Sequence, residues 1–169
     1  FRKGKATHSI QRPAGPMEES LLLKLGRDPA VERFSPVIDR RLRLGNGELV
    51  RLLGIDPLLD RSIRPEISKV ESLGKKTNDP ENLLSFLTDE KAIFVDHDLK
   101  AELGMTSDQI LQTAKGPLHA KGSFPNPSGE PLAIMDIGHV QTLYQLQGYI
   151  DRVDLILSDE SGFNSRWDK

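Results

Sequence analysis

The sequence contains no cysteine, only 5% aromatic residues and no long apolar run. Without cysteine, the chain has neither disulfides nor thiolate metal sites, whichever compartment it occupies. A net charge of −2 provides no basic face for nucleic acid, so we expect no nucleic-acid partner. The most apolar stretch, residues 131–150, still holds one histidine, three glutamines and two glycines. It is too polar for a membrane span, which needs about 20 mostly apolar residues.

The length of 169 residues favours one domain, which would bury roughly 70% of the surface of the unfolded chain. A hydrophobic content of 37% with 28% charged residues is typical of soluble globular proteins. The sequence opens on Phe1, without an initiating methionine or a recognisable signal peptide. We therefore expect a soluble fragment of a larger protein.

The first third of the chain has the clearest local patterns. Residues 5–11 indicate a weak strand, and the spacing of Met17, Leu21, Leu22 and Leu25 predicts a short helix with one apolar face. Two glutamates after Met17 would lie at the start of this helix, and the glycine after Leu25 would end it. All four apolar side chains are predicted to be core.

A hairpin follows. Residues 31–44 read as a long strand broken near Pro36, with Val37 on one side and Ile38 and Leu42 on the other. The Gly-Asn-Gly turn at 45–47 accepts positive φ, and residues 49–55 return as an antiparallel strand. The rest of the pattern predicts a helix from Asp79 and Pro80 through Leu87, strands at 92–95, 107–114, 118–124, 132–135 and 151–157, and helices at 99–103 and 137–146.

The densest cluster of potential metal ligands is Asp96-His97-Asp98. Two carboxylates and an imidazole suit a divalent cation, but adjacent side chains point in different directions and no second histidine stands at i+4. An aspartate between a strand and a helix is a good N-cap. We interpret the cluster as a cap, and we assign Asp56 and Asp136, which also follow apolar strands, to caps or turns.

No catalytic, cofactor-binding or metal-binding residues are predicted. The other histidines, at 8, 119 and 139, are scattered along the chain. The sequence has no Gly-x-Ser-x-Gly elbow, no Walker loop and no Gly-x-Gly-x-x-Gly turn. We therefore expect neither a catalytic triad nor nucleotide hydrolysis by this chain.

Two surface features remain open. Arg40, Arg41, Arg43 and Arg51 form a basic stripe across the hairpin, which either contacts an acidic partner or lipid headgroups or is simply a solvated sheet face. Phe163 and Trp167, in the polar C-terminal tail, either mark an interface or belong to a frayed end.

Five phrases in fixed order carry a family resemblance: Val-Glu-Arg-Phe-Ser-Pro-Val-Ile (31–38), Leu-Gly-Ile-Asp-Pro (53–57), the strand and helix at 92–104, Ala-Ile-Met-Asp-Ile (133–137) and Ile-Asp-Arg-Val-Asp-Leu-Ile-Leu (150–157). Together they resemble the extracytoplasmic core domain of FtsX-like, MacB-type ABC-transporter permeases. The resemblance extends over about residues 5–158. It departs from the family pattern at Ser107-Asp108, where Gly-Asp is usual, and matches a Val-x-Gly phrase only loosely at Ala120-Lys121-Gly122.

The resemblance implies a two-lobed α+β domain. Residues 1–60 and 148–169 would form a discontinuous membrane-proximal lobe, and residues 61–147 an inserted, β-rich lobe. It also implies a non-catalytic extracytoplasmic domain of a bacterial inner-membrane permease, without a cofactor. Its partners would be a cytoplasmic ATPase subunit, a second permease protomer, and an extracytoplasmic protein or lipid-linked cargo.

Two other classes of function stay open: a free-standing extracytoplasmic binding or adhesion module, and a small hydrolase or metal enzyme with a pocket joining Asp96, His97 and a distant acid. The permease interpretation makes one architectural prediction. A domain inserted between two membrane helices brings both ends to one membrane face. The strands near 5–11 and at 151–157 should therefore share a sheet, covered by the helix at 17–25.

Overall fold

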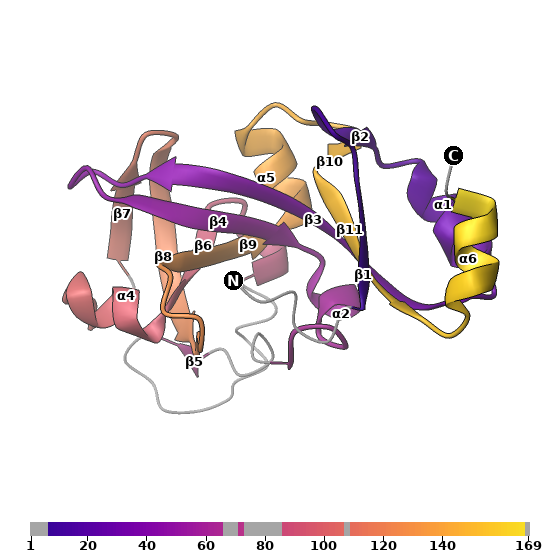
Figure 1. Ribbon diagram of the computed structural model, residues 1–169. Helices are drawn as coiled ribbons and strands as arrows, with labels where there is room; N and C mark the ends of the chain where they lie inside the picture. The colour runs from indigo at the N-terminus through magenta and orange to yellow at the C-terminus, as the bar shows by residue number, and fades with distance from the viewer. Residues whose placement is uncertain (1–6, 66–70, 73–85, 107–108, 168–169) are drawn as a thin grey trace.

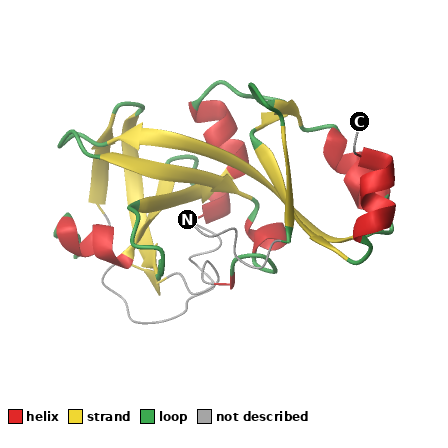
Figure 2. Ribbon diagram, in the orientation of Figure 1, coloured by secondary structure: helices red, strands yellow, loops and turns green. Residues whose placement is uncertain are grey.

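The computed structural model describes residues 7–65, 71–72, 86–106 and 109–167 (Figures 1 and 2). In chain order the strands are β1 (His8–Gln11), β2 (Met17–Glu18), β3 (Val31–Arg43), β4 (Leu49–Ile55), β5 (Glu71–Ser72), β6 (Ala92–Asp96), β7 (Gln109–Thr113), β8 (Gly116–Phe124), β9 (Leu132–Asp136), β10 (Tyr149–Ile150) and β11 (Arg152–Leu157). The helices are α1 (Leu21–Arg27), α2 (Pro57–Asp60), α4 (His97–Glu102), α5 (Ile137–Leu143) and α6 (Glu160–Trp167). None of the described helices has the length and apolar character needed to cross a membrane.

Most strands join one mixed sheet in the order β1-β11-β3-β4-β9-β6-β8-β5, with β7 also paired to β8. The pairs β4–β9 and β6–β8 are parallel, and the other ladders are antiparallel. Strand β3 runs along almost the whole sheet and pairs with β11 at one end and with β4 at the other (Figure 1). The predicted α+β class is confirmed.

The predicted pairing of the chain's first and last strands is also confirmed. β1 lies directly beside β11, with His8 opposite Leu155 and Gln11 opposite Arg152. Thr7 donates its backbone N–H to the carbonyl of Leu155, 148 positions away. The helix at this end covers the same strands, because Leu25 packs with Val153 and Leu155 in one apolar cluster.

The helix begins later than predicted. Met17 belongs to β2, which pairs with β10, and α1 starts at Leu21. The pairing of Met17 and Glu18 with β10 explains the difference, because it holds this segment extended and the helix can begin only after it. No acidic residue lies in the first turn of α1, and Gly26 lies inside the helix. Met17 and Leu25 are nevertheless buried in one cluster, as predicted, whereas Leu21 and Leu22 are only partly buried against it.

The predicted hairpin is confirmed, but Pro36 does not break β3. The carbonyl of Val37 accepts from Asp151 on the β11 side, so the ring nitrogen of Pro36 points to the β4 side. β4 ends at Ile55, opposite Val37, and the proline therefore displaces no ladder hydrogen bond. At the turn, Gly47 has φ +89°, a conformation that glycine adopts at no steric cost.

The tip of this hairpin closes the sheet on itself. Leu44 forms a bridge with Thr113 of β7, and Gly45 donates its N–H to the carbonyl of Gln112. Strands β3, β4, β9, β6, β8 and β7 thus form an incomplete barrel filled by one aliphatic cluster. Helix α5 packs on this cluster, and it comes so close that a Cβ on Gly54 would lie 3.0 Å from Val140.

The other predicted strands are present, and two helices differ in length. α4 starts at His97, because Asp96 caps it. α5 ends at Leu143 and not at 146, because the backbone turns to a left-handed conformation at Gln145, with φ 56°. The helix predicted from Asp79 lies outside the described residues except for its last turn at 86–88.

The parallel pairing of β4 with β9 carries the sheet across the predicted boundary between residues 1–60 and 61–147. Around that boundary the apolar side chains form separate clusters: one under α1 and α6, one inside the barrel, and one on the opposite sheet face. The division into a membrane-proximal and an inserted lobe remains a prediction.

Candidate functional site

A chain of alternating charges crosses one face of the sheet, and its inner end is fully buried. Asp60 ends α2, Arg64 lies one turn later, and Asp154 comes from β11. Arg64 bridges the two aspartates, and all three side chains have 0% exposure. Ser35 of β3, also buried, donates its hydroxyl to Asp60. Charges removed from water in this way must be matched by partners, because an unpaired buried ion costs several kcal/mol.

The chain of charges continues toward the surface through Arg152, which donates from Nε to Asp154 at 3.0 Å and also pairs with Asp39. Arg51 of β4 donates from Nε to the other oxygen of Asp39 at 2.9 Å. Beyond it, Arg51 lies 3.5 Å from Glu130.

Arg41 forms the outer end, with its Nη1 2.7 Å from Glu130. We call this set the ion-pair network: Ser35, Asp39, Arg41, Arg51, Asp60, Arg64, Glu130, Arg152 and Asp154. It ties α2 and its following turn to β11, β3, β4 and the loop before β9.

Two aspartates of the network, Asp60 and Asp39, have pKa values shifted in opposite directions. Burial raises the pKa of Asp60, because the charged carboxylate loses its hydration. Burial also acts to raise the pKa of Asp39, but the hydrogen bond from Arg51 and the charges of Arg51 and Arg152 outweigh it, so that pKa is lowered. The same contact with Asp39 raises the pKa of Arg51. Asp39 is thus held as a carboxylate more firmly than Asp60.

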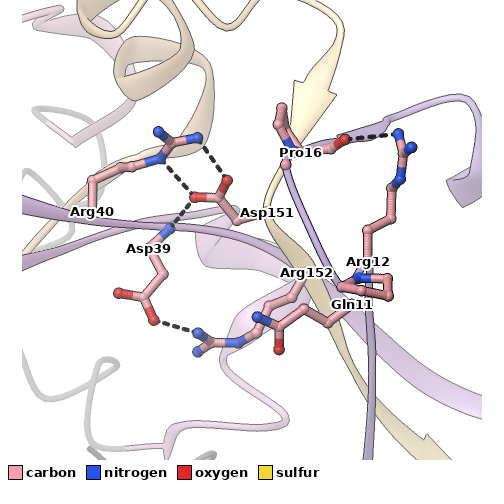
Figure 3. A pocket seen from close by; sticks show the side chains of 9 residues that line it. Gln11, Arg12, Pro16, Asp39, Arg40, Asp151 and Arg152 are labelled. Atoms are coloured by element: carbon pink, nitrogen blue, oxygen red, sulfur yellow. Dashed lines mark hydrogen bonds and ion pairs between the residues drawn. The ribbon is translucent and has the colours of Figure 1, made fainter.

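A pocket of about 420 Å³ lies beside the network, where β11 and β1 meet the middle of β3 (Figure 3). Arg40 holds Asp151 through two hydrogen bonds of 2.9 and 2.8 Å, and Asp151 also accepts the backbone N–H of Asp39. Arg152 lines the pocket next to them, and the segment from Gln11 to Pro16 forms the other wall. The pocket is therefore bounded by side chains of both signs.

The four arginines of the basic stripe do not lie on one face of the sheet. Arg40 lies on the opposite sheet face from Arg41, Arg43 and Arg51, because neighbouring residues in a strand alternate. Arg40, Arg41 and Arg51 each pair with a carboxylate. Most of the positive charge of the stripe is thus matched within the molecule.

The cap assignments are confirmed. Asp96 is buried and accepts the N–H of Leu99 at 2.6 Å and that of Leu132 at 2.7 Å. Asp56 caps α2, and Asp136 caps α5. Among the described residues, no group of three potential ligands stands close enough to hold a metal ion.

The histidines take part in separate local contacts. The Nδ1 atom of His97 lies 3.0 Å from the hydroxyl of Ser123. Ser123 is completely buried, so the pair does not present a nucleophile to substrate. His119 pairs with Asp89 on the surface, and His8 lies 3.2 Å from Glu160.

The aromatic residues of the C-terminal segment belong to the core and not to an exposed or frayed end. Phe163 is buried in the cluster under α1, and its ring stacks on that of Trp167 with 5.6 Å between the ring centroids. Trp167 donates its indole N–H to Asp28 at 2.8 Å, and Lys24 lies over its ring. Both aromatic side chains attach α6 to α1.

The sequence offered two signals for the network that we did not use. Asp60 and Arg64 stand four positions apart, the spacing of an ion pair on a helical turn. Arg152 and Asp154 alternate with apolar residues in a strand, which normally indicates a solvated face. Only the structure reveals that this face is covered and that the charges meet.

The order of the strands and helices is an α+β arrangement that is shared with solved extracytoplasmic domains of ABC-type transporters. The structure is similar to the extracellular domain of the noncanonic ABC-type transporter YknZ from Gram-positive bacteria, with a TM-score of 0.64 and 15% identity over 93% of this chain and 86% of that chain. It is also similar to the periplasmic region of MacB from Actinobacillus actinomycetemcomitans, with a TM-score of 0.56 and 12% identity over 89% of this chain and 67% of that chain. No protein-family profile matches the sequence, and no curated protein does. The resemblance inferred from the five phrases is confirmed at the level of the fold.

Proposed function

We propose that the chain is a non-catalytic extracytoplasmic domain of an ABC-transporter permease, which couples ATP hydrolysis in the cytoplasm to the handling of a substrate or partner outside the membrane. The observation that carries the proposal is the direct pairing of β1 with β11. It brings the start of the first strand and the end of the last strand to one end of the sheet. A domain inserted between two membrane helices needs this arrangement, and the likeness to YknZ and MacB supports it.

The chemistry of the described side chains supports a non-catalytic role. The aspartates that follow strands serve as helix caps, and Ser123 is buried. The ion-pair network suits a domain that passes on movement, because directional, matched contacts between five elements resist shear better than apolar contacts alone. The expected partners are a cytoplasmic ATPase subunit, a second permease protomer, and an extracytoplasmic protein or lipid-linked cargo.

Labelling from outside the cell tests the location. The chain has no cysteine, so a single introduced thiol reports its own site once any cysteines elsewhere in the full-length protein are replaced. In the full-length gene product, Glu102→Cys, at an exposed position at the end of α4, should react with a membrane-impermeant maleimide in intact cells. Ala133→Cys, at a fully buried position, is the matched control and should react only after denaturation. Labelling of Glu102→Cys only after lysis would falsify an extracytoplasmic location.

A second measurement tests the coupling. In the purified full-length assembly, deletion of residues 8–157 should leave basal ATP hydrolysis intact and abolish its response to cargo or to the extracytoplasmic partner. Loss of basal hydrolysis as well would assign the domain to assembly of the transporter. An unchanged response would show that the domain takes no part in coupling.

A further inference from the structure

The pocket between the segment from Gln11 to Pro16 and strands β3 and β11 has acidic groups that are already paired with arginines (Figure 3). Both oxygens of Asp151 accept hydrogen bonds, one from Arg40 alone and one from Arg40 and the backbone of Asp39. The Asp39 oxygens accept from Arg51 and Arg152. Each of these carboxylates accepts three hydrogen bonds and so uses three of its roughly four acceptor sites, which leaves little capacity to bind a metal or an ammonium group.

The arginines of the same pocket have donors to spare. A guanidinium has five N–H donors. Arg40 uses Nε and Nη2 for Asp151, and Arg152 uses Nε and Nη1 for its two aspartates. Arg12 makes one contact, from Nη1 to the carbonyl of Pro16 at 3.2 Å, and has no carboxylate partner among the described residues. The remaining hydrogen-bonding capacity of the three side chains is therefore entirely that of donors.

The charge of the lining points the same way. Three arginines face two aspartates, which leaves one positive charge, and Arg12 carries it. Arg40 and Arg152 are held in fixed orientations by their ion pairs, whereas Arg12 lies on an exposed segment. In Figure 3 the three guanidinium groups lie around the pocket and not side by side. Arg40 and Arg152 are therefore pre-organised, whereas Arg12 on the opposite wall can adjust to a ligand.

From this geometry we propose that the pocket binds a phosphate group. A tetrahedral phosphate presents several acceptor oxygens in different directions, as donors arranged around a pocket require, whereas a planar carboxylate presents two oxygens in one plane. Arginine is the side chain best suited to such oxygens. The phosphate belongs either to the free ion or to a phosphomonoester. This site goes beyond the proposed coupling function and does not depend on it.

The test is an NMR titration of the isotope-labelled chain with inorganic phosphate, at constant ionic strength balanced with sodium chloride. The expected result is saturable movement of the backbone amide signals of Gly15, Asp39 and Asp151. Arg12→Gln should weaken binding at least tenfold. The matched control is Arg43→Gln, because Arg43 is also an exposed arginine that donates to a backbone carbonyl four residues along the chain, but it lies outside the pocket. It should change the affinity less than twofold.

Three results would overturn the proposal: movement of the signals that does not saturate, an equal loss of affinity in both variants, or acetate binding as tightly as phosphate. The first two results would mean that the signals move only because of non-specific electrostatic interactions with the anion. The third would exclude selectivity for phosphate. Glycerol 3-phosphate as a second probe identifies the source, since tighter binding than the free ion indicates a phosphomonoester. Melting curves of both variants verify folding. If phosphate does not bind, the labelling and ATPase tests of the proposed function still stand. If those tests fail, the result of the phosphate titration is unaffected.

Discussion

The two faces of β11 bury their side chains by opposite means. Val153 and Leu155 point into the apolar cluster under α1 and α6, while Arg152 and Asp154 point to the other face and join the ion-pair network. All four are almost completely buried. Burial in this domain therefore does not follow polarity, because a covered face can be filled with matched charges as completely as with aliphatic groups.

The difference lies in how each face responds to change. Apolar packing is non-directional, and cores tolerate substitutions that conserve volume at a cost of less than about 1.5 kcal/mol. A buried ion network is directional, and the removal of one member leaves its partners desolvated without compensation. We expect the charged face to be the more sensitive of the two and to hold α2, β3 and β11 in one fixed arrangement.

The largest expected effect is that of Asp154→Ala. This change removes a partner of both Arg64 and Arg152 inside the protein, and it should lower the free energy of unfolding by about 3–5 kcal/mol. Chemical denaturation followed by circular dichroism measures the change. The comparison variant is Leu155→Ala, the next residue on the opposite face, with an expected loss of about 2–5 kcal/mol.

The comparison fails if Asp154→Ala costs less than about 1 kcal/mol. A loss of stability this small is typical of an exposed ion pair and would mean that water reaches the network. A loss in Leu155→Ala alone would make the apolar face the principal source of stability at this strand.

The next effect tests the apolar side inside the barrel. Gly54→Ala places a Cβ 3.0 Å from two carbon atoms of Val140 and 3.4 Å from the backbone of Ile137. Because α5 must move away from β4, we expect a loss of about 1–3 kcal/mol, the usual cost of overpacking. The double variant with Val140→Ala should recover part of that loss. An unchanged melting temperature in Gly54→Ala would mean that α5 shifts freely on the sheet.

The contrast between the faces also explains which parts of the structure the sequence predicts. The strands at 49–55, 92–95 and 132–135 follow from apolar runs between turn residues, and Asp96 follows from its place between a strand and a helix. Met17 was assigned to the wrong element, because its pairing with Ile150 is a contact between segments that no local pattern encodes. The network was missed for the same reason.

The residues of the ion-pair network are dispersed along the sequence from Ser35 to Asp154. In β11 polar and apolar residues alternate, and such alternation predicts that the polar face is exposed to solvent. The pocket depends in the same way on β1 and the loop after Gln11 coming to lie beside β3. Sequence patterns predict which side of a strand is apolar, but not what fills the space above the other side.

A smaller effect concerns the response of the charged face to pH. Asp39 has a folded-state pKa below its ordinary value of 3.8. Its contribution to stability is therefore complete above the unfolded pKa and is lost as the pH falls through the lower folded pKa. Asp39→Asn should be less stable than the parent near neutral pH, and its free energy of unfolding should fall less steeply below about pH 4.

The raised pKa of Asp60 acts with the opposite sign, because its contribution is present below the unfolded pKa and is lost as the pH rises through the folded one. Asp60 is present in both the parent and Asp39→Asn, so its contribution cancels when the free energies of unfolding of the two proteins are subtracted. Parallel acid-denaturation curves for the two proteins would mean that Arg51 and Arg152 do not hold Asp39 as a carboxylate.

The smallest expected effect tests how the aromatic residues of α6 attach to the apolar end of the sheet. Asp28 accepts hydrogen bonds from Arg166 and from the indole of Trp167, and the bond from Arg166 holds the pKa of Asp28 well below 3.8. Asp28→Asn removes the ion pair, but Arg166 is half exposed, and pairs at the surface contribute little to stability. Global stability should therefore change little, whereas the local environment of Trp167 should change.

Trp167 is the only tryptophan, so the tryptophan fluorescence reports the surroundings of this one side chain. In Asp28→Asn the emission should shift to longer wavelength, because a neutral amide oxygen accepts the indole N–H more weakly than a carboxylate does and lets more water reach it. In the parent the emission should stay constant as the pH falls to about 3, since Asp28 remains ionised well below its ordinary pKa. Glu160→Gln, with the same loss of one charge in the first turn of α6, is the control and should leave the spectrum unchanged. Identical spectra in all three proteins would mean that stacking on Phe163 holds the indole without Asp28, and that apolar contact alone attaches α6 at this end of the molecule.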